Sequence, residues 1–223
     1  MKKVENSYYM FNVKNEDIFA VADCFIASFP HSFAAKLGKK YVQKTMEWFL
    51  VCDDCSLYWI KNEDERCIGF VGAKLGYGST SGMIQHAFWQ GIIAALLRPW
   101  LLFTSEVRGQ FSLILSNIRH RIFGRKAQKK DYVIKQENLV PSVGLVVIGV
   151  SPEFQGKGYG RQLLSLFDEI VCKFGSNKAH LSVKIHNNPA IATYQKSGWK
   201  ISSEGDKTYR MTKKYFCIKD EIV

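Results

Sequence analysis

Residues 143–161 read VGLVVIGVSPEFQGKGYGR, and this stretch predicts the centre of the fold. Its first eight residues, 143–150, are almost continuously apolar, which is typical of a strand that is buried on both faces of a sheet. A turn with three glycines follows, and residues 158–174 then carry apolar side chains at helical spacing. The stretch therefore predicts a buried strand, a glycine-rich turn and an amphipathic helix, in that order.

The glycine-rich turn has the composition of an anion-binding site. Gly156, Gly158 and Gly160 keep side chains away, so several backbone N–H groups and the positive end of the helix dipole can face one anion. Lys157 and Arg161 add positive charge. The spacing fits neither the dinucleotide-binding fingerprint nor the Walker loop. A phosphate or pyrophosphate site is therefore expected, with a purely structural tight turn as the alternative.

The segments on either side of this stretch add further strands and helices. Downstream, the patterns predict a strand at 180–185, a short helix at 189–197 and a hairpin of strands at 199–203 and 208–215. Upstream, they predict a strand at 7–13, helices at 16–29 and 33–51, and a hairpin of strands at 57–61 and 67–75. We find no internal repeat, and the pattern favours an α/β fold with a mixed sheet.

Length and charge limit the class of protein. The chain has 223 residues, 47% of them hydrophobic and 23% charged, which fits one globular domain over residues 1–223. Thirty-one Lys and Arg residues against twenty Asp and Glu residues give a net charge of +11, which favours an anionic partner. Nucleic acid is the least favoured partner, because the basic residues do not interleave with aromatic ones on a recognisable motif.

Cysteine usage and the N-terminal residues favour a cytoplasmic location. Six cysteines are too few and too irregularly spaced to indicate a disulfide framework. The sequence begins without the apolar segment of a signal peptide. Cys52 and Cys55 form an isolated C-x-x-C pair that no nearby Cys or His pair completes, so no metal is expected.

Residues 77–138 differ in character from the rest of the chain. They include an apolar run at 83–103 and a basic region at 106–137, where eight Lys and Arg residues stand against three Asp and Glu residues. Arg98 and Pro99 interrupt the apolar run, which argues against a membrane-spanning helix. We expect two or three helices here, and a buried helix, a homodimer contact and a peripheral membrane contact all stay open.

Two motifs in the last third of the chain resemble those of the GNAT superfamily of acyl-CoA-dependent N-acyltransferases. In that family a strand leads into Q/R-x-x-G-x-G/A and a helix, and Gln155, Gly158 and Gly160 match this pattern in register. The second signature has Asn, then Ala, Tyr and a Gly-aromatic pair three, seven and eleven residues later. The residues that match it are Asn187, Ala190, Tyr194, Gly198 and Trp199. The resemblance covers the chain except for roughly residues 77–138.

The resemblance implies a GNAT-like α/β fold with a helical insertion, 77–138, between its third and fourth strands. It also implies an enzyme that transfers an acetyl group from acetyl-CoA to a primary amine. The cofactor-binding residues that it implies are Ile148, Gly149, Val150, Gln155, Gly156, Lys157, Gly158, Tyr159, Gly160, Arg161 and Asn187. In the family the strand pairs with the pantetheine arm, the glycine-rich turn binds pyrophosphate, and the Asn fixes the pantetheine or the strand end.

Tyr194 is the residue that the resemblance implies as the general acid. A phenol with a pKa of about 10 is protonated at neutral pH and can give its proton to the departing thiolate; packing of its helix is the alternative. The sequence does not identify a general base. Some members of the family place a Glu five residues before the motif Asn, where this chain has Ser182. The candidates by location are His31, His86, His186 and Glu153, and a water chain is an equal alternative.

The insertion is expected to shape the acceptor site, because typical relatives have only a short turn there. Its basic rim and aromatic residues suit a sugar ring that carries a phosphate or a nucleotide diphosphate. These aromatic residues are Phe88, Trp89, Trp100 and Phe103. We therefore expect a small-molecule amine, with an amino sugar or a nucleotide-linked amino sugar as the favoured class. A protein or peptide N-acetyltransferase and a non-catalytic CoA-binding or membrane-associated module are the alternatives.

Overall fold

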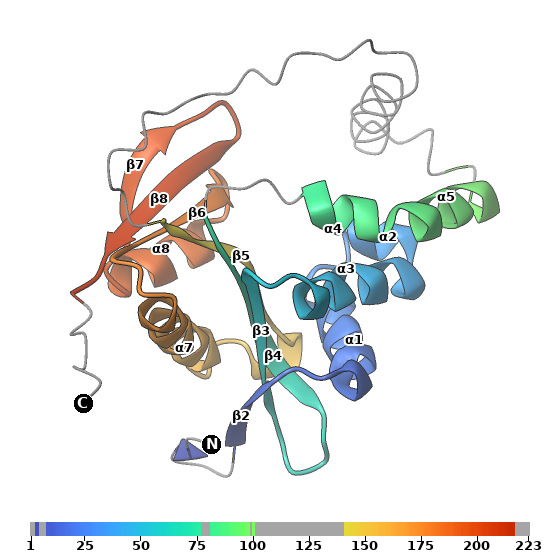
Figure 1. Cartoon of the computed structure of the whole chain (residues 1–223), viewed down its shortest axis with the longest axis horizontal. Coiled ribbons are helices and arrows are strands. Elements are labelled where there is room, and N and C mark those ends of the chain that lie inside the picture. Colours follow the sequence, from blue (N-terminus) through green and yellow to red (C-terminus); the bar gives the residue numbers. More distant parts are fainter. Residues whose placement is uncertain (1–2, 5–7, 77–80, 99, 101–140, 217–223) are drawn as a thin grey trace.

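The computed structural model describes residues 3–4, 8–76, 81–98, 100 and 141–216. Within these residues one mixed sheet has the strand order β1-β2-β3-β4-β5-β6-β8-β7 (Figure 1). Neighbouring strands are antiparallel except β5 and β6, which are parallel. The strands are β1 Lys3–Val4, β2 Tyr8–Asn12, β3 Cys55–Lys61, β4 Cys67–Leu75, β5 Val143–Val150, β6 Lys178–Lys184, β7 Lys200–Glu204 and β8 Thr208–Lys214.

Helices cover both faces of this sheet (Figure 1). One face carries α1 and α3 and the other carries α7 and α8, so we refer to the α1/α3 face and the α7/α8 face. The α-helices are α1 Ile18–Ser28, α2 Phe33–Leu37, α3 Lys39–Val51, α4 Ser81–His86, α5 Phe88–Leu97, α7 Tyr159–Lys173 and α8 Asn188–Lys196. Among the described residues, η1 Asn15–Asp17 and η3 Pro152–Phe154 are short 3-10 helices. The expected α/β architecture is confirmed.

Each face of the sheet has its own apolar core. Successive strand residues point to opposite faces, so in β4 Phe70 belongs to the α1/α3 core and Val71 to the α7/α8 core. The apolar side of α7, with Leu163 and Phe167 fully buried, fills the second core. β5 contributes to both cores, which explains why its sequence is apolar at nearly every position.

The predicted elements outside residues 77–138 are present with small shifts at their ends, but the helix predicted at 33–51 is divided. Gly38 separates α2 from α3 with a φ of +99°, a conformation that L side chains rarely adopt. The guanidinium of Arg98, just after α5, lies against Gly38 and donates a hydrogen bond of 3.0 Å to the carbonyl of Lys36. Helical periodicity continues across Gly38, so the break depends on a contact that the pattern does not contain.

The described part of the predicted insertion is helical. It consists of α4 and α5, and it follows β4, the third strand when the two-residue β1 is not counted. Most of the predicted helical and basic region, 101–138, lies outside the described residues, as do 77–80 and Pro99. Among the helices of the described residues, none has the length and apolar character needed to cross a bilayer.

The close packing around Gly149 in β5 leads to a prediction about stability. A Cβ at this position would lie 2.8 Å from the ring of Phe70 and 3.0 Å from that of Phe29. We expect Gly149→Ala to lower the free energy of unfolding by about 1–3 kcal/mol, because the two rings have to shift. Gly160→Ala is the matched control, since a Cβ there meets no atom within 4 Å, and it should be neutral or slightly stabilising. Denaturant unfolding measures both; equal midpoints would contradict the prediction.

Candidate active site

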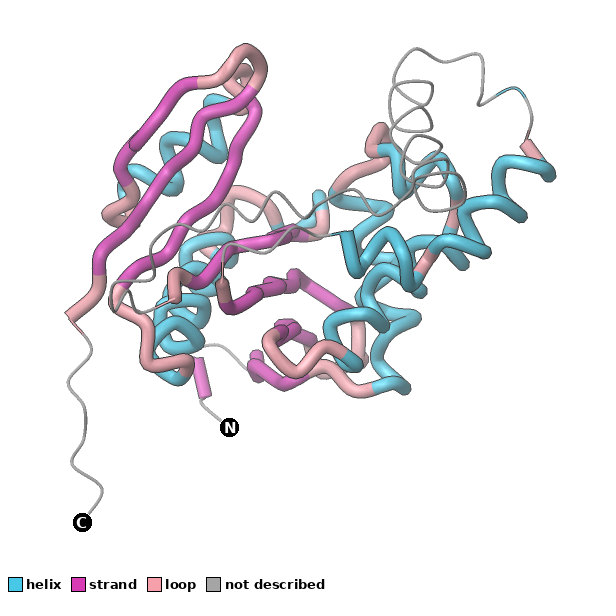
Figure 2. The backbone as a smooth tube through the Cα atoms, turned by 45° about the horizontal axis from the view of Figure 1, so that its top comes forward, coloured by secondary structure: helices cyan, strands magenta, loops and turns pink. Residues whose placement is uncertain are grey.

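Strands β5 and β6 separate soon after they begin. Their parallel pairing is limited to Val143 with Ala179 and Gly144 with His180. By contrast, β5 stays paired with β4, and β6 stays paired with β8, along their whole lengths. Figure 2 shows β6, β8 and β7 running side by side and turning away from the central strands. In the part of the chain that the structure describes, the edge of β5 beyond Gly144 therefore has no neighbouring strand.

Alternate residues of β5 present their backbone groups to this open edge. The N–H of Ser151 donates to the carbonyl of Ile68, 2.8 Å away, on the β4 side. Because strand residues alternate, the N–H and C=O groups of Val150 and Ile148 point the opposite way, toward the open edge. Gly149 lies two residues before Ser151, so its own backbone groups face β4 as those of Ser151 do. An extended ligand lying along β5 could therefore form hydrogen bonds with Ile148 and Val150.

A β-bulge lies near the closed end of this edge. Gly72 of β4 pairs with Val147, whereas the next residue, Ala73, pairs with Leu145, which leaves Val146 as an additional residue. A bulge bends its strand and redirects the backbone, and bulges are common next to active sites. The bend lies only a few residues beyond the last pair between β5 and β6.

The glycine-rich turn connects the open edge to the N-terminus of α7. Gly156 and Gly158 have φ values of +75° and +90°, and a Cβ on either residue would meet no atom within 4 Å. No side chain of the described residues caps α7 at Gly158. A 15-residue helix therefore directs its first N–H groups and the positive end of its dipole out of the protein.

Gln155 and Lys157 connect the turn to its surroundings. The side-chain Nε2 of Gln155 donates a hydrogen bond of 3.0 Å to the carbonyl of Val150 and so holds the turn against the end of β5. The Nζ of Lys157 lies 5.3 Å from the ring centroid of Phe154, within cation–π distance. The ring of Tyr159, the first residue of α7, packs edge-on against Phe154 and is buried. Lys157 and Arg161 are exposed beside the uncapped helix end.

Tyr194 lies on α8, against the core on the α7/α8 face. Its ring centroid is 6.2 Å from that of Trp199, and burial raises the pKa of its phenol to about 12. The phenol therefore stays protonated through the physiological range and can act as a proton donor. Gly198 has a φ of +87° and turns the chain after α8, so that Trp199 can enter the core. The Gly-aromatic pair of the motif thus positions the helix that carries Tyr194.

Asn187 is the N-cap of α8. Its Oδ1 accepts a hydrogen bond of 3.4 Å from the N–H of Ala190, and the residue is exposed. Its observed contact is therefore with the start of the helix that carries Tyr194. This side-chain hydrogen bond joins the Asn and Ala positions of the second motif in one helix cap.

Solved structures of other proteins share this fold. PH1933 from Pyrococcus horikoshii OT3 has 16% identity and a TM-score of 0.57, with 94% of this chain and 99% of that chain covered. The PaiA N-acetyltransferase of Thermoplasma acidophilum, in complex with coenzyme A, has 15% identity, a TM-score of 0.54 and the same coverage. The ribosomal-protein-S18-alanine N-acetyltransferase of Escherichia coli has 12% identity and a TM-score of 0.55, with 97% of this chain and 99% of that chain covered. No curated protein sequence matches the chain.

A family model brings the two motifs together. Residues 133–199 match the acetyltransferase (GNAT) family, and this range contains β5, the glycine-rich turn, α7 and the motif with Tyr194. Over this range the chain matches the GNAT acetyltransferase family, and solved N-acetyltransferases share the fold of the described residues.

The sheet presents a cationic face beside the open edge. Ala179, Leu181 and Val183 of β6 and Met211 of β8 point into the α7/α8 core, so the alternate residues of both strands point to the α1/α3 face. Cross-strand pairing places Lys200 of β7 on the same face, opposite Thr212. The residues that we call the cationic face are Lys178, Lys184, Lys200, Arg210 and Lys214. No Asp or Glu of these three strands shares it, because the one acidic residue, Glu204, pairs with Tyr209, which faces the α7/α8 core.

The four candidate bases from the sequence are not brought together. His31 is exposed in the turn before α2, and His86 ends α4 with its Nε2 3.8 Å from a carboxylate oxygen of Glu47. His186 and Glu153 are exposed at the ends of β6 and β5. The sequence interpretation did not consider His180, which lies at the last residue pair between β5 and β6. The alternation of residues 180–185 could have indicated its strand but not which strand lies beside it.

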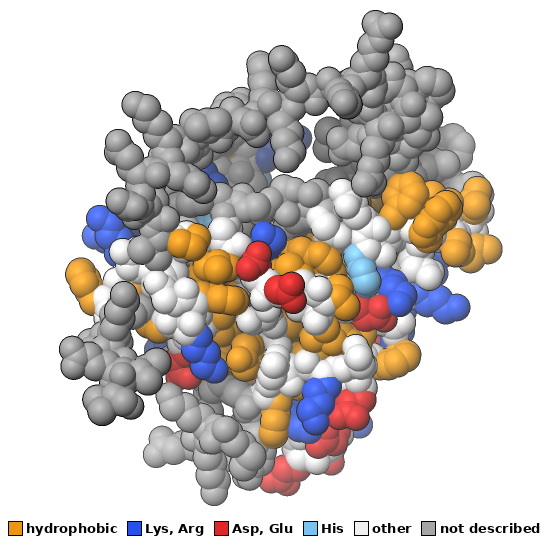
Figure 3. All heavy atoms as spheres, in the orientation of Figure 1, with side chains coloured by type: hydrophobic (Ala, Val, Ile, Leu, Met, Phe, Trp, Pro, Cys, Tyr) orange, Lys and Arg blue, Asp and Glu red, His pale blue; other side chains and the backbone are white. Residues whose placement is uncertain are grey.

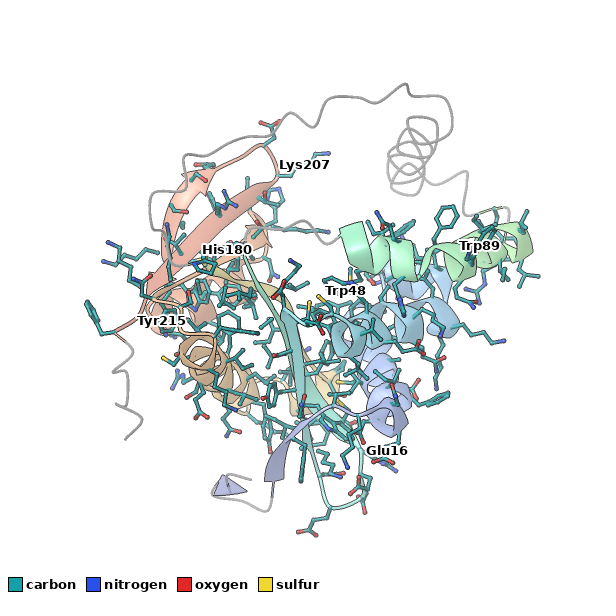
Figure 4. All side chains as sticks on the ribbon, in the orientation of Figure 1. Glu16, Trp48, Trp89, His180, Lys207 and Tyr215 are labelled. Carbon is teal, nitrogen blue, oxygen red and sulfur yellow. The ribbon has the colours of Figure 1, made fainter. Side chains whose placement is uncertain are left out.

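Two of the aromatic residues expected near the acceptor lie on the surface of the described part of the insertion. Trp89 and Trp100 are 71% and 62% exposed, on and just after α5, and Phe103 lies outside the described residues. Figure 4 shows Trp89 and His180 on opposite sides of Trp48. Hydrophobic side chains gather on the surface over α5 (Figure 3). α5 packs on α2 and α3, and the expected aromatic wall of Phe88, Trp89, Trp100 and Phe103 stays a prediction.

Proposed function

We propose that this protein is an acetyl-CoA-dependent N-acetyltransferase of the GNAT family that acetylates the primary amine of a small anionic molecule. Phosphorylated or nucleotide-linked amino sugars are the class to test first. The observation that carries the proposal is the position of the cationic face, which adjoins the open edge of β5. A cofactor on that edge and an anionic acceptor on that face would meet between β5 and β6. The preference for an amino sugar rests on the positive charge of the cationic face, together with the primary amine that the reaction requires.

The open edge and the turn fit the shape of acetyl-CoA. The pantetheine arm is an extended chain with amide groups, and Ile148 and Val150 offer backbone donors and acceptors for it. The pyrophosphate fits the uncapped N-terminus of α7, where Gly156, Gly158 and Gly160 leave space for it. Gln155 keeps these two parts in register through its bond to the end of β5. In this arrangement the thioester lies toward the closed end of the edge, near the bulge at Val146.

The chemistry requires charge stabilisation and a proton donor. As the amine attacks, negative charge develops on the thioester oxygen, and a backbone N–H of the open edge can stabilise it. As the C–S bond breaks, Tyr194 can give its proton to the sulfur. Burial of Tyr194 keeps its pKa above that of a free phenol, so the proton is present at neutral pH. Tyr194 is thus the general acid in this proposal.

Cofactor binding is tested by placing negative charge at the N-terminus of α7. Gly158→Glu should weaken acetyl-CoA binding at least about tenfold, because a carboxylate there occupies the anion site and repels the phosphates. Gly175→Glu is the matched control: Gly175 also has a positive φ and open space around it, but it follows the opposite end of the same helix. Calorimetric titration with acetyl-CoA measures both. Unchanged affinity in Gly158→Glu would contradict the proposed site.

The role of Tyr194 is tested by removing only its hydroxyl group. Tyr194→Phe should lower kcat about a hundredfold, because the thiolate loses its proton donor, and should leave the Kd for acetyl-CoA unchanged. Tyr209→Phe is the control, since that ring packs against the same core from β8. Steady-state kinetics and calorimetry separate the two effects. An equal loss in both variants would show that Tyr194 acts through packing.

The acceptor class is tested with a pair of probes that differ by one phosphate. Glucosamine 1-phosphate should be acetylated with a lower KM than glucosamine. Arg210→Gln should raise the KM for the phosphorylated probe about tenfold and leave that for glucosamine unchanged, because a charge-assisted hydrogen bond is lost. Arg66→Gln, the same exchange at the distant β3–β4 turn, serves as the control. A preference of wild type for glucosamine would contradict the anionic class.

A further inference from the structure

His180 lies where β5 and β6 part. It is the last residue of β6 that pairs with β5, opposite Gly144, and beyond this pair the two strands diverge. Its neighbours Ala179 and Leu181 are buried in the α7/α8 core. Because residues alternate along a strand, the imidazole of His180 is on the α1/α3 face, together with the cationic face.

The imidazole of His180 lies against Ser142, the residue before β5, and Gly144 of β5. The Nδ1 of His180 is 2.9 Å from the Oγ of Ser142, a fully buried residue whose carbonyl accepts a hydrogen bond from Gly76. The Nε2 lies over Gly144, where a Cβ would be only 3.0 Å from it. A glycine on β5 therefore makes room for the ring, and a buried hydroxyl holds its other nitrogen. The Nε2 is thus placed at the closed end of the open edge.

The surroundings of His180 favour its neutral form. Burial lowers the pKa of the imidazole below its usual value, and the charges of Arg210 on β8 and Lys178 on β6 lower it further. The other charged groups that the register of these strands places on this side of the sheet are Lys184 on β6, Lys214 on β8, Lys200 on β7 and Lys74 on β4. All six are cations. A neutral imidazole can accept a proton at pH 7.

The reaction needs such a group, because an amine is protonated at neutral pH and an ammonium ion cannot attack a thioester. We propose that His180 is the general base, whose Nε2 takes a proton from the acceptor ammonium; this inference rests on the proposed function. In the matching tautomer, Nδ1–H donates to the Oγ of Ser142 and Nε2 carries the lone pair. Ser142 is then a positioning residue that selects the tautomer.

The steps balance as follows. His180 removes one proton from the ammonium, and the neutral amine forms a C–N bond with the thioester carbon. The C–S bond breaks, and the phenol of Tyr194 gives its proton to the leaving thiolate. The new amide nitrogen loses its surplus proton to the tyrosinate, which restores Tyr194. His180 finally releases its proton to water, so one proton leaves for each ammonium consumed.

The pair His180→Gln and His186→Gln tests this assignment in the full chain. His186 is the control because it is exposed beyond the end of β6. Acetyl transfer is measured at saturating acetyl-CoA with glucosamine 1-phosphate and a panel of simple primary amines, from pH 6 to 9.5. We expect His180→Gln to lower kcat/KM about a hundredfold at pH 7, with the Kd for acetyl-CoA unchanged. The deficit should shrink at least tenfold by pH 9.5, because the neutral fraction of an amine with a pKa of about 10 rises by more than a hundredfold between pH 7 and pH 9.5.

Each other outcome overturns the assignment. Equal activity of His180→Gln and wild type removes His180 from the reaction. A loss of the same size at every pH, or a weaker affinity for acetyl-CoA, shows a structural or cofactor-binding role. Wild type that binds acetyl-CoA but acetylates no amine of the panel overturns the proposed function and the base together. If His180→Gln does not fold, Ser142→Ala replaces it: a partial loss of kcat that shrinks with rising pH is expected, and unchanged kcat overturns the proposal.

Discussion

The incomplete pairing of β5 with β6 is the constraint on which the rest of the structure depends. Two parallel strands that paired along their full length would satisfy each other's backbone groups and leave no space between them. Here only Val143 and Gly144 are paired, and Ile148 and Val150 keep N–H and C=O groups directed at an open edge. The carbonyl of Val150 also accepts a hydrogen bond from Gln155, which ties the glycine-rich turn to this edge. An open strand edge of this kind can pair with an extended ligand, so the proposed cofactor site follows from the way the sheet divides.

The two faces of β6 differ: one packs in the apolar core and the other faces the proposed site. Ala179, Leu181 and Val183 anchor the strand in the α7/α8 core, and this rigid packing fixes the alternate residues on the other face. Those residues, with Arg210 across from Ser182, form a surface that carries positive charge. Burial, and after it the charges of Arg210 and Lys178, lower the pKa of the His180 imidazole. In our proposals the same positive charge also attracts the acceptor, so acceptor preference and the protonation of His180 would depend on one electrostatic environment.

Much of the fold could be predicted because its signals are local. The apolar run of β5, the glycines of the turn and the periodicity of α7 each act within a few residues, and the structure places all three where expected. The break at Gly38 was missed because it involves Arg98, which lies far along the chain. His180 was missed for a similar reason. Alternation predicts the strand that contains it, but its position beside Gly144 depends on the order of strands in the sheet.

By itself, the sequence determined the order of strands and helices, the glycine-rich turn and the two motifs that identify the family. These depend on backbone propensity and residue spacing, which are properties of short segments. Only the tertiary structure decided that β5 and β6 separate, that lysines from three strands and Arg210 share one face, and that Trp89 of α5 lies away from it. Such features arise from the packing of segments that are distant in sequence, and pairing between strands depends on the whole sheet rather than on any one strand.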